Sequence, residues 1–161
     1  MNLCFRILRS IIYVPAFILL FGWIGGTVRV FDQRIGIRLP PWTITPGIIC
    51  MIIGGMLVLA CVGVFITRGK GTPAAFDPPR EFVASGPYAY VRNPMYIGGL
   101  ILLIGFGLYH QSLSILILSV ILIFLFHLFV VFYEEPVLEK QFGKSYVDYK
   151  KNINRWMPKW K

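Results

Sequence analysis

The stretch NPMYIGGLILLIGFGLYHQSLSILILSVILIFLFHLFVVFY runs from Asn93 to Tyr133 without a charged side chain. A helix rises ~1.5 Å per residue, so one helix of this length would be about twice as long as the ~30 Å hydrocarbon core of a bilayer is thick. We therefore expect a hairpin of two membrane-spanning helices, over residues 94–109 and 113–133. The polar sequence Tyr109-His110-Gln111-Ser112 marks the turn between them.

Two further charge-free stretches lie upstream of this hairpin, over residues 10–28 and 39–67. A charge at the bilayer centre costs about 3 kcal/mol or more, so each stretch is a candidate span. Pro40, Pro41 and Pro46 must lie at or before a helix start, which leaves 47–67 as the second span. The predicted fold class is all-α and integral to the membrane, with four spans in a single domain over residues 1–161.

The composition of the 161-residue chain agrees with this fold class. Hydrophobic residues make up 57% and charged residues 14%, with a mean hydropathy of +0.70. Soluble domains average ~45–50% apolar and ~25% charged residues, so a soluble enzyme is excluded, and the aromatic content excludes a disordered chain. The three cysteines have no metal-ligand spacing, so no metal site is expected.

The basic residues flank the spans and predict the orientation of the chain. With four spans, 13 of the 16 Lys and Arg residues face one compartment and 3 face the other. The positive-inside rule then places both termini in the cytoplasm; in a prokaryote the membrane would be the plasma or inner membrane. Because these charges do not form a stripe on a soluble face, nucleic-acid binding is not expected.

Two sequence patterns predict how helices meet their surroundings. Phe142, Tyr146, Tyr149 and Ile153 follow a helical spacing among lysines, which predicts a C-terminal amphipathic helix at the membrane surface. Gly22-x-x-x-Gly26 predicts that the first span approaches another backbone closely, within the chain more readily than in a dimer. The sequence does not decide the oligomeric state.

Polar residues gather where the hairpin's two ends meet. The block from Ser85 to Tyr96 precedes and opens one arm, and Glu134-Glu135 ends the other. Adjacent carboxylates oppose the helix dipole and repel each other, so they either form a solvated helix end paired with lysines or bind a cationic or polyol ligand. His127 lies seven residues before Glu134 on the same face, as a functional group or as an interhelical hydrogen-bond partner.

Four motifs in this half of the chain have a known counterpart. They are the G-x-Y-x-x-x-R-[HN]-P-x-Y block from Gly86 to Tyr96, the G-x-G at 105–107, the pair Glu134-Glu135, and F-G-x-x-Y-x-x-Y from Phe142 to Tyr149. In these motifs, their order and their spacing, the sequence resembles the isoprenylcysteine carboxyl methyltransferase and phospholipid methyltransferase family of membrane enzymes.

The resemblance implies an S-adenosylmethionine-dependent membrane methyltransferase whose cofactor is bound by about residues 80–158. A membrane lipid or another amphiphilic small molecule would be the acceptor. By position, the implied cofactor contacts are Arg80, Glu81, Phe82, Val83, Tyr88, Asn93, Pro94, Met95, Tyr96, Gly105 and Glu134.

The predicted function is methyl transfer to a lipid-like or prenylcysteine-like acceptor at the cytoplasmic membrane surface. Carboxyl O-methylation is expected first, with amine or thiol methylation as alternatives. Arg92 would orient an anionic acceptor, and Glu135 or His127 would accept a proton from an amine or thiol.

Two positions depart from the family pattern. Asn93 stands where a histidine is common, and Val130 stands where isoprenylcysteine enzymes have a substrate-binding arginine. A non-catalytic membrane assembly protein or lipid-binding protein that retains the fold is therefore the alternative function.

Overall fold

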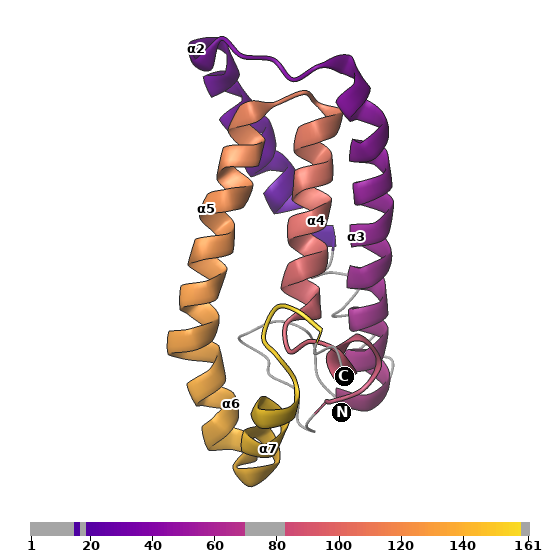
Figure 1. Cartoon of the computed structure of the whole chain (residues 1–161), viewed down its shortest axis with the longest axis vertical. Helices are drawn as coiled ribbons and strands as arrows, with labels where there is room; N and C mark the ends of the chain where they lie inside the picture. Colours follow the sequence, from indigo (N-terminus) through magenta and orange to yellow (C-terminus); the bar gives the residue numbers. More distant parts are fainter. Residues whose placement is uncertain (1–14, 17–18, 70–82, 159–161) are drawn as a thin grey trace.

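The computed structural model describes residues 15–16, 19–69 and 83–158, and these residues form helices, turns and loops without a strand. Three long helices, α3, α4 and α5, stand side by side, and helical residues 19–28 pass behind them (Figure 1). In chain order the elements are η1 (Arg29–Phe31), α2 (Asp32–Ile35), η2 (Pro41–Thr43), α3 (Ile44–Val64), η3 (Phe65–Gly69), η4 (Gly86–Ala89), α4 (Pro94–Tyr109), α5 (Leu113–Phe129), η5 (Val130–Glu134), α6 (Glu135–Phe142) and α7 (Lys144–Asn152).

The α4–α5 hairpin turns at the polar residues that the sequence singles out. Pro94 opens α4, where its missing N–H would have had no helical partner anyway. After Tyr109 the chain reverses through Gln111, which has φ 54°. The Ser112 side chain then accepts a hydrogen bond from the N–H of Ile115 (3.3 Å) and caps the start of α5.

The helix α3 begins three residues before the predicted start of the second span, at Ile44, and so contains Pro46 in its first turn. The first turn of an α-helix leaves its N–H groups without intrahelical partners, so a proline costs little there. Beyond Val64 the helix widens into the π-helical turn η3, and α5 likewise continues through the π-helical turn η5.

Glycines bring the backbones of α3 and α4 into contact at two levels. A Cβ built on Gly54 would lie 2.6 Å from the carbonyl oxygen of Gly98, and one on Gly105 would lie 2.7 Å from that of Gly47. Both pairs are therefore required to be glycine for the helices to pack this closely. The paired glycines are seven residues apart on each helix, which keeps them on one face.

Among the described residues, Gly22 and Gly26 do not make the close contact predicted for the first span within the chain. No described atom lies within 4 Å of a Cβ built on either residue. Gly25 makes the close contact instead, because a Cβ there would lie 3.2 Å from the Phe106 ring of α4. On the same helical segment, Phe21 packs edge-on against Phe126 of α5.

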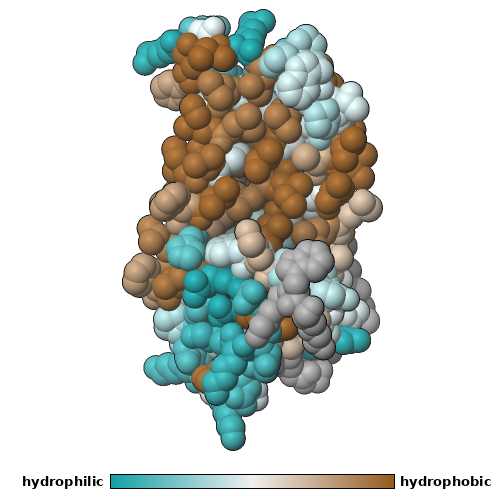
Figure 2. Space-filling view, viewed as in Figure 1, coloured by the Kyte–Doolittle hydropathy of each residue, from teal (hydrophilic) through white to brown (hydrophobic). Residues whose placement is uncertain are grey.

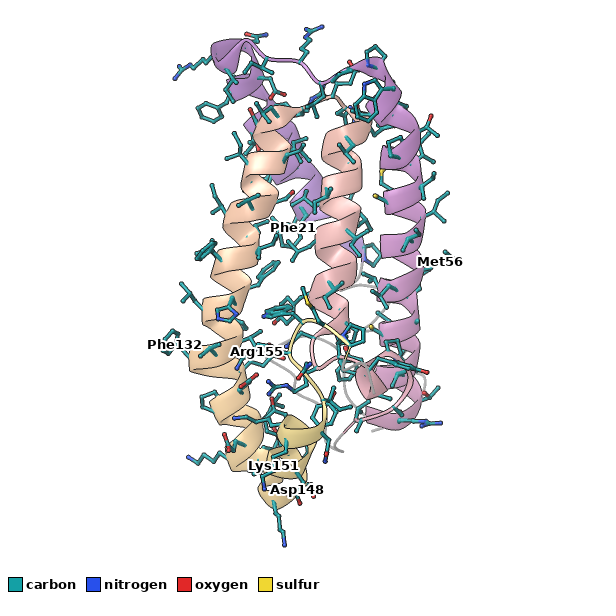
Figure 3. All side chains as sticks on the ribbon, viewed as in Figure 1. Phe21, Met56, Phe132, Asp148, Lys151 and Arg155 are labelled. Atoms are coloured by element: carbon teal, nitrogen blue, oxygen red, sulfur yellow. The ribbon has the colours of Figure 1, made fainter. Side chains whose placement is uncertain are left out.

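The described chain contains two helical stretches long and apolar enough to cross a membrane, Pro41–Arg68 and Leu113–Phe142, with the shorter apolar α4 between them. A hydrophobic band covers the long helices, and the end that carries α6 and α7 is hydrophilic (Figure 2). Phe132 and Met56 point outward from opposite sides of the bundle (Figure 3). The membrane character predicted from composition is therefore visible as an apolar band on the face shown in Figure 2.

The C-terminal helices fold back onto the protein. Gly143, at φ 55°, separates α6 from α7. Tyr146 on α7 is only 3% exposed, and the Tyr149 hydroxyl donates to the carbonyl oxygen of Tyr88 (2.6 Å). The aromatic face predicted to lie at the membrane surface therefore packs against protein. Helical periodicity reveals an apolar face but does not identify what that face packs against.

Candidate functional site

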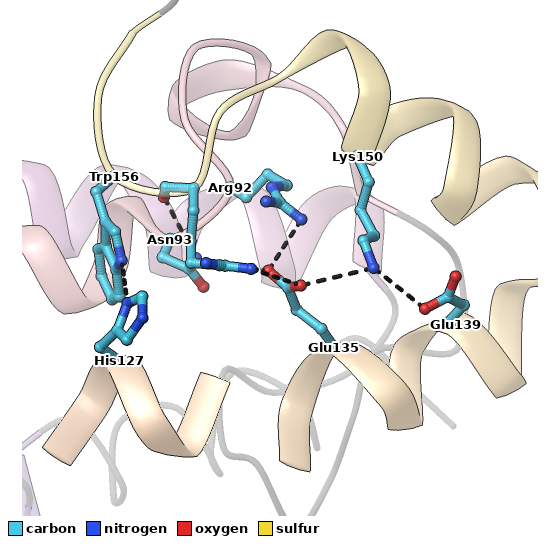
Figure 4. Close-up of polar contacts among 8 residues, drawn as sticks. Arg92, Asn93, His127, Glu135, Glu139, Lys150 and Trp156 are labelled. Atoms are coloured by element: carbon cyan, nitrogen blue, oxygen red, sulfur yellow. Dashed lines mark hydrogen bonds and ion pairs between the residues drawn. The ribbon is translucent and has the colours of Figure 1, made fainter. Parts of the chain in front are cut away.

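The hydrophilic end of the bundle is organised around one buried carboxylate, that of Glu135 at the start of α6. Arg155 donates to it from Nε (2.7 Å) and Nη2 (3.0 Å), and Arg92 forms an ion pair with it at 2.9 Å. Lys150 approaches its second oxygen at 3.6 Å and also pairs with Glu139 (Figure 4). Glu135 is 4% exposed, so these cations compensate a charge that water barely reaches.

The cations around Glu135 determine its protonation state. Burial alone would raise the pKa of this carboxyl, but the hydrogen bonds from Arg155 and the charges of Arg92, Arg155 and Lys150 outweigh burial and lower it. Glu135 is therefore ionised at neutral pH and fully engaged within the protein.

The neighbouring carboxylate, Glu134, has a different environment. Its Oε2 accepts a hydrogen bond from the hydroxyl of Tyr96 (2.8 Å), and no cation in the described ranges pairs with it. Burial raises the pKa of Glu134, partly offset by the Tyr96 hydrogen bond, and the charge of Glu135 raises it further. Of the two adjacent carboxylates, Glu135 is neutralised by protein groups, whereas Glu134 has no countercharge among the described residues.

A small cavity lies beside these carboxylates, with a volume of about 70 Å³. Charged groups of both signs line it, together with aromatic and aliphatic side chains. Arg92 contributes a buried Nε that has no hydrogen-bond partner among the described residues. The lining is Phe65, Val83, Tyr88, Arg92, Asn93, Val130, Glu134, Glu135, Leu138, Phe142, Tyr146 and Tyr149.

Residues 153–157, which we call the C-terminal strap, run without helical structure from α7 across the start of α4 to α5. The N–H of Arg92 donates to the carbonyl oxygen of Asn154 (2.9 Å), and the Asn93 side chain donates to that of Arg155 (3.3 Å). Trp156 donates from Nε1 to Nδ1 of His127 (3.1 Å). The strap thus joins the N-terminal end of α4 to α5 and α6.

The hydrogen bond from Trp156 determines the tautomer of the neutral His127 ring. An indole N–H only donates, so Nδ1 must be the unprotonated ring nitrogen and Nε2 carries the proton in the neutral ring. The Trp156 ring also meets Tyr96 edge-on, with centroids 6.5 Å apart. Tyr96 therefore connects the strap to Glu134.

A family model for phospholipid methyltransferases matches residues 42–145 of this chain. The chain belongs to the phospholipid methyltransferase family. Membership implies methyltransferase activity toward lipid-like substrates and a membrane location. No curated protein and no solved structure matches the chain.

The structure brings many of the sequence-predicted residues together. Val83, Tyr88, Arg92, Asn93, Glu134 and Glu135 line the cavity, and Tyr96 adjoins it through Glu134. Met95 packs against the cluster of Cys61, Val83 and Tyr88, behind the cavity. Pro94 is fully buried at the start of α4.

Other predicted residues lie elsewhere. Gly105 is in the α3–α4 contact, facing Gly47 and Met51 away from the cavity. His127 is held by Trp156 on the α5 side of the strap. Arg80, Glu81 and Phe82 lie outside the described residues.

Three residues of the site escaped the sequence reasoning: Arg155, Trp156 and Lys150. Arg155 and Trp156 follow the amphipathic stretch, where the sequence offers no periodic signal. Lys150 is one of several lysines in the C-terminal amphipathic segment, and its position in the sequence does not single it out. Among the described residues, no group of three His, Cys, Asp or Glu side chains could hold a metal ion.

Proposed function

We propose that this phospholipid methyltransferase uses S-adenosylmethionine to methylate a lipid-like acceptor, at the end of the bundle where Glu134 lies. The observation that carries the proposal is the unequal pairing of Glu134 and Glu135. Glu134 is a half-buried carboxylate with no countercharge among the described residues, which favours a cationic ligand. Glu135 cannot compete for that ligand because three cations already hold it.

The groups lining the cavity fit this cofactor. Its sulfonium and its amino group are cationic, its ribose carries hydroxyl donors, and its carboxylate is anionic. Glu134 can accept a hydrogen bond from the ammonium or the ribose diol, while Arg92 Nε, a buried donor with no partner among the described residues, is left for an anionic group of the acceptor. Phe65, Tyr88 and Phe142 supply apolar walls.

The cavity of about 70 Å³ is smaller than the ~300–1,000 Å³ usual for small-molecule sites, so binding requires the surrounding segments to separate. The strap is the candidate for this movement. It lacks helical structure, and side-chain bonds to Glu135 and His127 hold it across the site. Displacing it would free the N-terminal end of α4, where Arg92 and Asn93 line the cavity.

The bound cofactor supplies a methyl group on its sulfonium, which the acceptor takes while S-adenosylhomocysteine leaves. The residues of this chain contribute by positioning the reactants and excluding water. Glu134 holds the cofactor, Tyr96 orients Glu134, and the strap shields the site from bulk solvent. Burial raises the pKa of Tyr146 to about 12, so this wall of the site stays neutral.

The proposed methyl-accepting group depends on which side chains of the site are free to accept a proton. Glu135 is ion-paired and His127 presents a protonated nitrogen, so in our proposal neither acts as the base that an amine or thiol would need. A carboxylate acceptor needs no base, and Arg92 Nε would orient it. Carboxyl O-methylation therefore remains the first proposal, although Val130 leaves the cavity without the arginine common in isoprenylcysteine enzymes.

Equilibrium binding of radiolabelled S-adenosylmethionine to detergent-purified protein tests the cofactor assignment. Charge-assisted hydrogen bonds are worth about 1.5–3 kcal/mol, so Glu134→Gln should weaken binding by roughly tenfold to a hundredfold. Glu139→Gln, a carboxylate on α6 that does not line the cavity, is the matched control and should bind as the wild type does. Equal binding by all three proteins would remove Glu134 from this role.

Transfer assays then identify the acceptor. A prenylcysteine analogue, a phospholipid with a primary amine and a small thiol are supplied with labelled cofactor, and the labelled product is extracted. Methylation of the carboxyl acceptor alone would support the proposal. Cofactor binding without transfer to any acceptor class would favour the non-catalytic alternative.

A further inference from the structure

A second concave surface lies at the opposite end of the bundle from the cavity. It is an apolar groove of about 230 Å³ between the segment around α2 and the first turns of α5. Phe31 and Ile35 form one wall, and Ile117 and Ile121 form the other. The proposed methyl transfer uses none of these residues.

The walls of this groove are held in place by specific bonds. Asp32 Oδ1 accepts a hydrogen bond from the N–H of Ser114 (2.9 Å), which fastens α2 to the N-terminal end of α5. Farther along, Arg38 forms an isolated bridge with Ser112, and the Leu39 N–H donates to the carbonyl oxygen of Gln111 (3.3 Å). The groove is therefore a fixed feature between two anchored elements.

A cation stands at the edge of this apolar groove. The guanidinium carbon of Arg34 lies 5.7 Å from the centroid of the Phe31 ring, which lines the groove. No carboxylate in the described part of the chain forms an ion pair with Arg34, and Asp32 is engaged with Ser114. Hydrophilic side chains gather where α2 lies, directly above the hydrophobic band (Figure 2).

We propose that this groove binds one acyl chain of an anionic phospholipid whose phosphate pairs with Arg34. The reasoning is charge complementarity: an apolar groove bordered by a guanidinium that has no ion pair within the described ranges matches an amphiphile with an anionic head and a hydrocarbon tail. The inference rests on the proposed methyl-transfer site and on the four-span orientation predicted from the sequence, which together put the groove in the leaflet opposite that site. The lipid is thus a bound component distinct from the methyl acceptor.

Native mass spectrometry of delipidated protein titrated with phosphatidylglycerol or phosphatidylcholine tests the site. The attraction between one basic residue near a membrane surface and an anionic lipid corresponds to about a fivefold preference in binding for the anionic over the zwitterionic lipid. We expect that preference for phosphatidylglycerol in the wild type and its loss in Arg34→Gln. Arg38→Gln removes an exposed cation from the segment that follows α2 and should keep the preference.

A second pair of variants tests the groove itself. Ile117→Trp should fill it and reduce retention of both lipids, whereas Ile123→Trp lies on the same helix outside the groove and should not. These two isoleucines are 45% and 44% exposed, so they are matched in accessibility. Binding of S-adenosylmethionine is measured in parallel and should match the wild type in Arg34→Gln, which separates failure of this proposal from failure of the methyltransferase proposal.

Two results would overturn the assignment. The first is a phosphatidylglycerol preference that persists in Arg34→Gln or disappears equally in Arg38→Gln. The second is equal lipid retention by Ile117→Trp and Ile123→Trp. Either would mean that the lipids bind through the general basic fringe or the apolar band.

Discussion

Glu134 and Glu135 are adjacent, yet the same substitution should destabilise the protein at Glu135 and leave its stability nearly unchanged at Glu134. Glu135→Gln preserves the shape of the side chain but removes the charge that Arg92, Arg155 and Lys150 share. The side chain of Arg92 is only 10% exposed, so its guanidinium would be left buried without a countercharge. Removing one partner of a buried ion pair costs about 3–5 kcal/mol, and we expect a loss near the lower value because Arg155 is a quarter exposed.

Glu134→Gln should leave stability nearly unchanged. The amide oxygen of glutamine can still accept the hydrogen bond from Tyr96, and no described cation loses a partner. The substitution also removes a charge from a poorly hydrated position. We therefore expect a change of less than about 1 kcal/mol in the free energy of unfolding.

Thermal unfolding in detergent, followed by intrinsic fluorescence, measures this contrast. For a chain of this size 1 kcal/mol shifts Tm by roughly 2–4 °C, so Glu135→Gln should lower Tm by about 6–12 °C. Glu134→Gln should keep the wild-type Tm while losing affinity for S-adenosylmethionine. Equal Tm losses in the two variants, or a wild-type Tm in Glu135→Gln, would refute the division of roles between these carboxylates.

The helix contact, the strap and the Glu135 cluster each give a further measurable outcome. Gly54→Ala should cost about 1–3 kcal/mol, because its Cβ would lie 2.6 Å from a carbonyl oxygen of α4, while Gly55→Ala meets no described atom within 4 Å and should hold or raise Tm. Trp156→Phe keeps an aromatic ring but removes the donor to His127, at about 1 kcal/mol, and a double-mutant cycle with His127→Phe should show non-additive losses in unfolding free energy. Because the folded pKa of Glu135 is lowered, the Tm difference between wild type and Glu135→Gln should be full above pH ~4.3, the usual pKa of Glu, and shrink as the pH falls below it.

Local signals in the sequence explain why the α4–α5 hairpin was predictable. A proline at the start of α4 and a polar turn ending in a capping serine give its boundaries without long-range information. The π-helical turns and the early start of α3 carry no comparable signal. The helix contact was missed for a related reason: Gly47 and Gly54 meet glycines more than 40 residues away, whereas the four-residue spacing of Gly22 and Gly26 is only a local pattern.

The sequence predicts where the site lies but not which of its charged residues pair with each other. The hairpin topology alone brings the Arg92 region near Glu134 and Glu135. Which carboxylate is neutralised depends on Arg155, 20 residues beyond Glu135, and on the return of the chain after α7. Helical periodicity likewise marked Tyr146 as part of an apolar face but could not say that the face meets protein.

The pairing of Glu135 with Arg155 also sets an order of events during synthesis. The chain grows at ~5–20 residues per second, so the 20 residues between these partners separate their appearance by roughly 1–4 s. During that interval the two adjacent acidic side chains lie at the end of an apolar helix while Glu135 lacks Arg155, which donates two hydrogen bonds to it. Desolvating them would be costly then, so they hold this end of α5 at the aqueous surface until the strap arrives to bury one of them.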